Sequence, residues 1–291
     1  MRMAYRIDFT RELATERRRI ALEQIDRTLG ELTDDALDVH AGVHAFRRRA
    51  KKIRALLRLF RGAAPGWYRR ENAALRDLAR EYAALRDSDV ALATFERIAS
   101  ELSAEFESAA LRADLIEARR CRMRDDTAAG ELPGLQKALR KVRRRMDAWP
   151  DVDCPPRTVV AGLCKTYKRG RTAFLDLEVR SSAAAWHEWR KRVKYLGYQW
   201  KLLRDVWPAV IDTWWHELDR LADLLGDDHD LDQLARRLAE RGGPGRRLER
   251  LLAKRSRALR REAHSLGERL YAEPTRCVRQ RLRVWLDEAS A

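Results

Sequence analysis

One combination of residues that could bind phosphate occurs twice in this chain. The pattern is His-x-x-Arg-(Arg/Lys)-x-x-Lys, and the two occurrences start 143 residues apart. Because residues three and four apart are neighbours on a helix, each occurrence places one histidine and three cations on one helix face. The residues are His44, Arg47, Arg48 and Lys51 in the first, and His187, Arg190, Lys191 and Lys194 in the second. The same offset matches Arg58 with Lys201, so we expect two copies of one helical unit.

These residue types suit a negatively charged partner. Arginine offers a fork of donors, lysine a compact charge, and histidine an N–H that gains charge below about pH 6.5. The segment from Gly42 to Gly62 holds eight Arg and Lys residues and no Asp or Glu. Like charges at this spacing destabilise a helix, and no acid of the segment relieves them. A polyanion-binding face is therefore favoured over an idle basic one, and we expect tighter binding on mild acidification if the histidines touch the ligand.

The helices that carry the cations also have an apolar face. In both segments apolar residues recur at spacings of three and four, which places them opposite the cations. In the first segment they are Val43, Phe46, Ala50, Ile53, Leu57 and Phe60, and in the second Trp186, Trp189, Val193, Leu196, Trp200 and Leu203. Each helix should pack on one side and present positive charge on the other.

The remaining sequence predicts an all-α protein. Eight prolines separate long stretches of helical period, and nothing between them has the alternation of a strand. We expect helices at 9–30, 35–61, 66–86, 89–124, 134–148, 156–180, 183–206, 208–226, 230–241, 245–271 and 274–288. The clearest loops are 128–134 and 242–245. The repeat divides the chain into an N-terminal unit, 1–149, and a C-terminal unit, 150–291.

Composition points to a soluble protein with a negatively charged partner. The formal net charge is +16, although charged residues of both signs make up 36% of the chain and hydrophobic residues 45%. Such a chain can bury a core and still attract polyanions. The four cysteines lack the spacing of a zinc site or a disulfide framework. No membrane span or signal peptide is expected, so we predict a cytoplasmic protein without cofactor or metal.

Five ordered motifs resemble the CHAD family, the conserved-histidine α-helical domain. They cover most of the chain and include both segments with the repeated histidine. They are VHAFRRRAKKIRALLRLF at 43–60, LAREYAALRDSDV at 78–90, GLCKTYKRGRTAF at 162–174, WHEWRKRVKYLGYQW at 186–200 and LADLLGDDHDLDQL at 221–234. No acidic strand tunnel of the CYTH type, to which some members are fused, is present, so the chain resembles the stand-alone form.

The resemblance implies two pseudo-symmetric antiparallel helical bundles around a basic cavity, and binding of inorganic polyphosphate. It implies that the eight residues of the repeated pattern face the ligand, with Lys165, Arg169 and Arg171 as additions. Arg58 and Lys201 share the same helix faces and complete the expected set. An association with polyphosphate granules follows from this ligand.

Two Asp-x-Asp segments need another role, because carboxylates repel phosphate. They are Asp87 with Asp89, and Asp230 with Asp232, again 143 residues apart. We expect them to cap helix starts, or to hold a basic side chain in place. His229 and Asp230 resemble the His-Asp pair of metal phosphohydrolases, but the first unit has Arg86 in place of the histidine, which argues against a metal.

Three other functions compete with polyphosphate binding. A nucleic-acid-binding protein could use the same cations, although the repeated faces lack the Asn and Gln that read bases. An enzyme would need a metal or an in-line nucleophile positioner, and we find no carboxylate cluster, P-loop or glycine-rich phosphate loop. A scaffold for an acidic protein would use the same residues. We therefore expect a non-catalytic binder, with nucleic-acid or general polyanion binding as the alternative.

Overall fold

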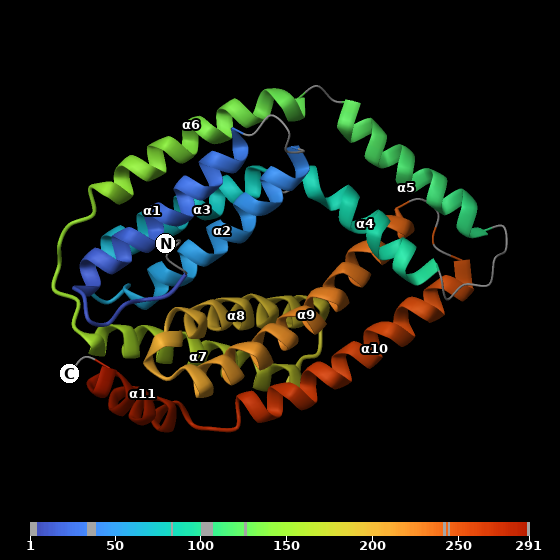
Figure 1. The fold of residues 1–291 in the computed structure, drawn as a ribbon. Helices are drawn as coiled ribbons and strands as arrows, with labels where there is room; N and C mark the ends of the chain where they lie inside the picture. Colours follow the sequence, from blue (N-terminus) through green and yellow to red (C-terminus); the bar gives the residue numbers. More distant parts are fainter. Residues whose placement is uncertain are drawn as a thin grey trace.

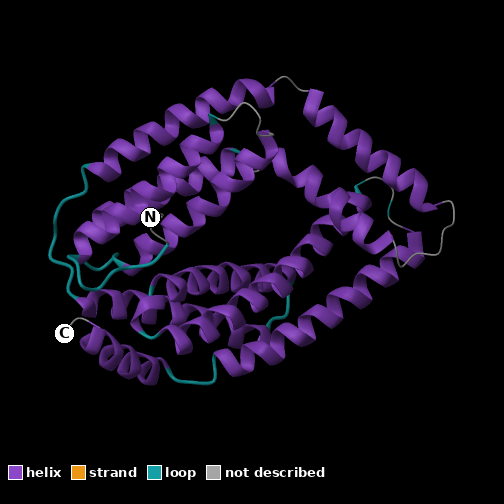
Figure 2. Cartoon of the chain, in the orientation of Figure 1, coloured by secondary structure: helices purple, strands orange, loops and turns teal. Residues whose placement is uncertain are grey.

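The computed structural model describes residues 5–33, 39–82, 84–99, 107–124, 127–240, 243 and 245–289. Over these ranges all regular structure is helical, which confirms the all-α prediction for this part of the chain (Figure 2). The elements are α1 (Leu13–Leu32), α2 (Val39–Leu59), α3 (Pro65–Glu81), α4 (Ala84–Ala99), α5 (Glu107–Arg124), α6 (Thr127–Asp147), α7 (Pro156–Val179), α8 (Ala183–Leu202), η1 (Arg204–Val206), α9 (Pro208–Ala239), α10 (Gly245–Leu270) and α11 (Thr275–Ala289). None of these described helices combines the length and the apolar character that crossing a membrane requires.

Several helices begin at residues that favour a helix start. Pro65, Pro156 and Pro208 open α3, α7 and α9. Proline is tolerated at this position because its missing N–H would have no partner within the helix. Ser182 precedes α8, and its Oγ accepts a hydrogen bond of 3.2 Å from the amide of Ala185. The predicted starts of these four helices agree with the structure to within one residue.

The prediction of one helix over 89–124 is wrong. Helix α4 ends at Ala99, α5 begins at Glu107, and the two contact each other. Phe95 of α4 and Leu115 of α5 are fully or almost fully buried in the same hydrophobic cluster. Helix α5 therefore packs against α4, and this contact lets both bury an apolar face.

The prediction of separate helices at 208–226 and 230–241 is also wrong, because α9 is continuous through the acidic run. Asp228 is only 4% exposed. Its Oδ1 accepts hydrogen bonds from Ser256 Oγ at 2.5 Å and from Arg260 Nε at 3.0 Å. These α10 partners satisfy the buried carboxylate, so the acidic run continues the helix instead of ending it.

The two expected loops have different outcomes. Residues 128–134 are helical, because α6 begins at Thr127 and includes Pro133. The proline removes one backbone hydrogen bond near the start of the helix, and the remaining turns continue past it. Between α9 and α10, Gly243 and Gly245 have φ angles of 94° and 72°, which fit a loop there. Residues 241, 242 and 244 lie outside the described part of the chain.

The order of helix contacts is the same in the two halves of the chain. Helix α1 packs on α2 and α6, as α7 packs on α8 and α11 (Figure 1). Helices α2 and α3 pack together, as do α8 and α9. The starts of α1 and α7, at Leu13 and Pro156, and those of α3 and α9, at Pro65 and Pro208, are each 143 residues apart. The helix bounds thus follow the register of the repeated cationic pattern.

The hydrophobic core joins the two halves. The larger buried cluster extends from Tyr5 to Leu286 and includes helices of both predicted units. The smaller one combines Phe95 and Leu115 with Leu234 of α9. Burial of apolar surface therefore stabilises the halves as one body, and the boundary between 149 and 150 remains a prediction from the repeat.

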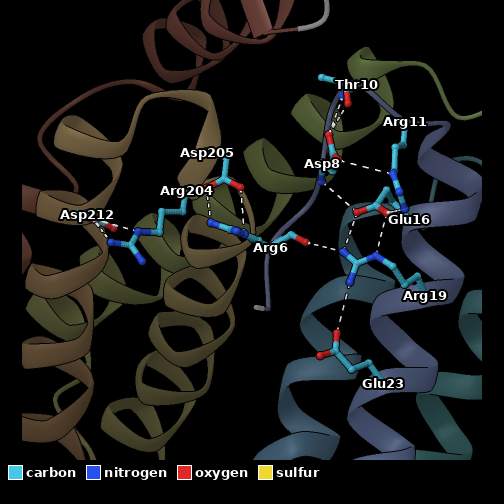
Figure 3. A network of polar contacts seen from close by, with 10 residues as sticks. All are labelled: Arg6, Asp8, Thr10, Arg11, Glu16, Arg19, Glu23, Arg204, Asp205 and Asp212. Atoms are coloured by element: carbon cyan, nitrogen blue, oxygen red, sulfur yellow. Dashed lines mark hydrogen bonds and ion pairs between the residues drawn. The ribbon is translucent and has the colours of Figure 1, made fainter. Parts of the chain in front are cut away.

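The N-terminal segment crosses from one half to the other (Figure 3). The amide of Ile7 donates to the Leu202 carbonyl at 2.8 Å, and Arg6 forms an ion pair of 3.1 Å with Asp205. On the other side, the fully buried Glu16 accepts from the amide of Asp8 at 2.9 Å and from Arg19 Nη2 at 2.7 Å. The segment is therefore fixed to α1 and to the end of α8.

Helices α2 and α7 approach closely where glycine permits it. A Cβ atom at Gly162 would lie 2.1 Å from the carbonyl oxygen of Leu59, far inside van der Waals contact. Arg61 donates from Nη2 to the Gly162 carbonyl at 2.9 Å and strengthens the crossing. This contact fixes the C-terminal end of α2, and so the direction in which its cationic face points.

Candidate anion-binding site

The two helices that carry the repeated pattern lie at the centre of the molecule. Helix α2 contacts α8, α8 contacts α9, α9 contacts α4, and α4 contacts α2, so the four form a closed circuit (Figure 1). Where α2 meets α8, Gln199 Nε2 donates to the Ala55 carbonyl at 3.0 Å, and the guanidinium of Arg58 lies 3.7 Å from the ring centre of Tyr195. This contact joins the two helices just after their repeated cations.

His187 forms a pair with His229 of α9. Their Nδ1 atoms are 3.3 Å apart, and their ring centres are 4.5 Å apart. A hydrogen bond at this position requires one ring to carry its proton on Nδ1 and the other on Nε2. The structure therefore couples the repeated histidine of the second unit to a residue that has no histidine counterpart in the first.

Cations from three helices surround this histidine pair. Burial, followed by the charges of Lys191 and Arg190, lowers the pKa of His187. Burial, followed by Arg190, His187, Arg236 and Lys51, lowers the pKa of His229 to about 3. Lys51 belongs to α2, so the first repeated face reaches the histidines held by the second. Both rings are neutral near pH 7, and the local positive field comes from Arg and Lys.

A second group of neighbouring cations involves Lys52 of α2 and Lys201 near the C-terminal end of α8. Burial, followed by the charge of Lys201 and then by those of Arg48 and other arginines, lowers the pKa of Lys52 to about 8. Lys201 Nζ lies 3.8 Å from the ring centre of Trp215. Lys52 was absent from the expected set, because its counterpart at the 143-residue offset is Tyr195 and the repeat did not mark it.

Acids from neighbouring positions balance part of this charge, which corrects the expectation that the cationic faces lack relief. Arg49 forms an ion pair with Glu31 of α1. Lys191 and Arg192 both form ion pairs with Glu188 on the same helix. Relief for the acid-free segment of α2 therefore includes an acid from another helix.

Helix α9 presents carboxylates to the α8 cations. The pKa of Asp223 is raised by burial and by Asp219, while the charges of Lys194 and Arg190 oppose the increase. Asp219 also opposes the lowering of the Lys201 pKa that burial causes. These acids hold the α8 side chains in place and reduce the net field that a ligand would meet.

Two residues of the expected set lie away from the shared face. Arg58 is only 7% exposed, and its Nη1 donates to the Arg54 carbonyl at 2.7 Å, so it packs between helices. Arg171 donates from Nε to the Tyr271 carbonyl at 3.0 Å and points towards the connection between α10 and α11. Their positions on a helix face were right, but tertiary contacts occupy both guanidinium groups.

The other expected residues have more accessible positions. His44 and Arg48 are exposed on α2, and Arg47 donates to the Tyr82 carbonyl at 3.4 Å. Lys165 and Arg169 are exposed on α7. Burial, followed by the charge of Arg169, lowers the pKa of Arg61 at the end of α2. Lys165 and Arg169 therefore extend the positive region from α2 towards α7.

The expected capping role of the second Asp-x-Asp segment is wrong, because Asp230 and Asp232 lie inside α9. Asp232 instead forms an ion pair of 2.6 Å with Arg236, whose charge acts on the histidine pair. The backbone of Asp87 and Asp89 belongs to α4, and their side chains lie outside the described residues.

His229 was singled out in the sequence only as part of a weak His-Asp dipeptide. Treating 208–239 as one helix marks His229 more clearly. It lies four residues after Leu225 and three after Gly226, and this spacing puts all three residues on one helix face. Gly226 is the position where Arg190 Nη2 approaches α9, at 3.8 Å from a notional Cβ. Among the described residues, no group of three or more His, Cys, Asp or Glu side chains could hold a metal ion.

Comparisons with known proteins agree with the fold and the motifs. The chain is similar over 98% of its length to the crystal structure of the CHAD domain from the plant Ricinus communis, with a TM-score of 0.58 and 18% sequence identity over 95% of that chain. No curated protein matches the sequence. The model of the CHAD domain family matches residues 19–239, which include both repeated cationic patterns. The chain therefore belongs to the CHAD domain family.

Proposed function

We propose that this protein binds inorganic polyphosphate, without chemically converting it, along the cationic faces of α2 and α8. The observation that carries the proposal is the convergence of Lys51, Arg190 and Arg236, from three helices, on the His187–His229 pair. Membership of the CHAD family supports this class of ligand.

The chemistry of the site suits a chain of phosphates. Polyphosphate carries roughly one charge per phosphate and has no bases, so its binder needs donors along a path and no groups that read a sequence. The α2 and α8 faces offer arginine forks, lysine charges and the N–H groups of neutral imidazoles. Each helix of about 20 residues extends ~30 Å, enough to meet several successive phosphates.

The matched helix order supports an internal duplication with a basic cavity between its copies. Both units contribute the same cationic pattern from equivalent helices, and α2, α4, α8 and α9 contact one another in a circuit. A ligand held between two such faces is contacted from both sides. This arrangement favours a thin, flexible chain over a wide duplex.

A direct comparison of ligands tests the proposal. We expect long-chain polyphosphate to bind at physiological salt at least a hundredfold more tightly than DNA of matched charge, a difference of about 2.7 kcal/mol. Equal affinities would establish a general polyanion surface and overturn the assignment.

Charge reversal then locates the site. The double variant Lys51→Glu with Lys194→Glu should lose polyphosphate binding by at least a hundredfold. The matched control is Lys137→Glu with Lys141→Glu, which makes the same charge change on exposed positions of α6. Helical circular dichroism and thermal melting check both folds. Equal losses in the two variants would show that net charge alone attracts the ligand.

The same proposal places the protein on polyphosphate granules in the cell. A fluorescent fusion should colocalise with stained granules, and the Lys51→Glu, Lys194→Glu variant should be diffuse. A wild-type fusion that stays diffuse in granule-rich cells would contradict this part of the proposal and leave the binding measurement unaffected.

A further inference from the structure

Helix α10 carries a line of cations that plays no part in the site described above. Its core face consists of Leu248, Leu252, Ala263, Leu266, Gly267 and Leu270, all buried. On the opposite side, successive spacings of four, four, three and four residues place five cations within an arc of about 80°. These exposed residues, named here the α10 stripe, are Arg246, Arg250, Lys254, Arg257 and Arg261.

No side chain of the α10 stripe makes an ion pair or a hydrogen bond among the described residues. The acids of α10 are engaged elsewhere or lie off the line: Glu262 pairs with Arg220, Glu268 lies beside His264, and Glu249 lines the groove between α9 and α10. The stripe thus differs from the α2 and α8 faces, where Arg49 pairs with Glu31. Its charge is directed to solvent without neutralisation.

The α10 stripe is separate from the histidine pair. Adjacent residues of α9 point in different directions, since Asp228 bonds to Arg260 of α10 while His229 contacts His187 of α8. The stripe lies opposite the buried face of α10, and Figure 1 shows α10 along the outer edge of the molecule. A ligand on the stripe would leave the α2 and α8 faces accessible.

We propose that the α10 stripe binds the phosphodiester backbone of duplex nucleic acid without preference for base sequence. Arg246 and Arg261 are 15 residues apart, which corresponds to about 22 Å along the helix. A DNA strand presents a phosphate about every 3.4 Å along its axis, so roughly six phosphates span this length. The stripe contains Arg and Lys only, which contact phosphate, and no Asn or Gln that would pair with an adenine edge.

Shape decides between a duplex and a flexible chain. The stripe lies on one face of a single helix, so it contacts a ligand from one side only. A flexible polyphosphate chain would lose conformational freedom by following it, whereas a duplex is stiff over about 150 base pairs and already holds its phosphates in a regular array. A fixed row of cations therefore favours the ligand whose anions are fixed. This inference is independent of the proposed polyphosphate site.

The test compares two variants with equal charge change. In the stripe variant Arg246, Arg250, Lys254, Arg257 and Arg261 are replaced by Gln. In the control Arg69, Lys137, Arg157, Arg180 and Arg276 are replaced by Gln; these cations are also exposed and make no ion pair among the described residues, but they are dispersed over the surface. The probe is a mixed-sequence DNA duplex of about 30 base pairs, measured at several salt concentrations.

We expect the stripe variant to bind the duplex at least tenfold more weakly at low salt, and to lower the slope of log K against log salt by about 4, since each phosphate contact contributes about 0.9. The control should keep most of the affinity, and both variants should bind polyphosphate like the wild type. Equal loss of duplex binding in both variants, full retention in the stripe variant, or a parallel loss of polyphosphate binding in that variant would each overturn the inference.

A variant with only two substitutions repeats the test in case the fivefold variant misfolds. Arg250→Gln with Arg257→Gln alters two exposed side chains opposite the core, and should lower the salt slope by about 2. An unchanged slope with a native melting temperature would contradict the inference as directly as the larger variant.

Discussion

The Nδ1 atom of His187 lies 3.3 Å from the Nδ1 atom of His229, and the two rings belong to different helices. One proton between the two nitrogens satisfies both rings, whereas a second would set two N–H groups and two positive charges against each other. The neighbouring Arg190 and Arg236 oppose protonation further. The free protein therefore keeps this pair neutral, and uptake of a proton there depends on what else is bound.

The first prediction concerns acid stability. The pKa of His229 is about 3 in the folded protein, below the 6.5 of an unfolded histidine. The unfolded chain then binds more protons than the folded one at any pH from about 6.5 down to 3, so the free energy of unfolding falls as the pH falls through this window. After allowance for partial exposure, we expect a loss of about 1 kcal/mol at pH 5.

Melting curves between pH 7.5 and about 4.5 measure this loss. The variant His229→Gln should be less stable than the wild type near neutrality, because the pair is broken, but its stability should change less with pH. If wild type and variant show the same pH dependence, the histidine pair is not the source of the acid sensitivity.

The second prediction concerns binding and pH. A bound polyanion favours the charged imidazolium, so it raises the lowered pKa values of His187 and His229. Binding must then take up protons, and affinity increases as the pH decreases through the pKa values of the complex. Because both histidines are neutral in the free protein, the increase in affinity comes from protons taken up on binding. It does not come from charge that the free protein already carries.

Calorimetry in two buffers of different ionisation enthalpy measures the protons taken up when polyphosphate binds near pH 6. We expect fewer in His187→Asn than in wild type. His216→Asn, a change at an exposed histidine of α9, should leave the uptake unaltered. Equal proton uptake in wild type and His187→Asn would show that the pair does not respond to the ligand.

The third prediction concerns the N-terminal segment. Glu16 is fully buried and receives the Asp8 amide and the Arg19 guanidinium. Glu16→Gln removes the buried one of the two carboxylates that Arg19 contacts and leaves only Glu23, so we expect a loss of about 2–3 kcal/mol in the free energy of unfolding from urea titration. Glu12→Gln, at an exposed position before α1, should change it by less than about 0.5 kcal/mol. Similar effects would exclude the buried network as the cause.

The features that the sequence predicted well are local. Apolar spacing of three and four residues identified α2 and α8 with their repeated cations, and a proline at its start identified α7. Helical period and first-turn proline depend only on residues a few positions apart. They are therefore readable without knowledge of the packing.

The features that the sequence missed depend on distant residues. The acidic run of α9 was interpreted as a helix boundary because nothing nearby shows that Asp228 bonds to Ser256 and Arg260. The pairing of His229 with His187 requires α8 and α9 to lie against each other. Local sequence offers cations and acids, but only the fold decides which of them meet.

The same reason explains why one expected ligand residue is internal. Arg58 has the helical position of a surface cation, and its repeat counterpart Lys201 is only partly buried. On α2, however, that position meets Tyr195 of α8, whose ring covers the guanidinium at 3.7 Å. Equivalent positions in a repeat can therefore have different environments when the two copies pack on each other.

The last prediction concerns the crossing of α2 and α7. At Gly162, a Cβ atom would lie 2.1 Å from the backbone oxygen of Leu59, and backbone cannot rotate away as a side chain can. Gly162→Ala must separate the helices and weaken the 2.9 Å hydrogen bond from Arg61, so we expect a loss of about 3 kcal/mol or a failure to fold. Gly62→Ala is the matched control, because nothing lies within 4 Å of a Cβ there. If urea titration gives both variants wild-type stability, the close approach of α2 and α7 is not required, and the orientation of the α2 cations must be fixed by its other neighbours, α1, α3 and α8.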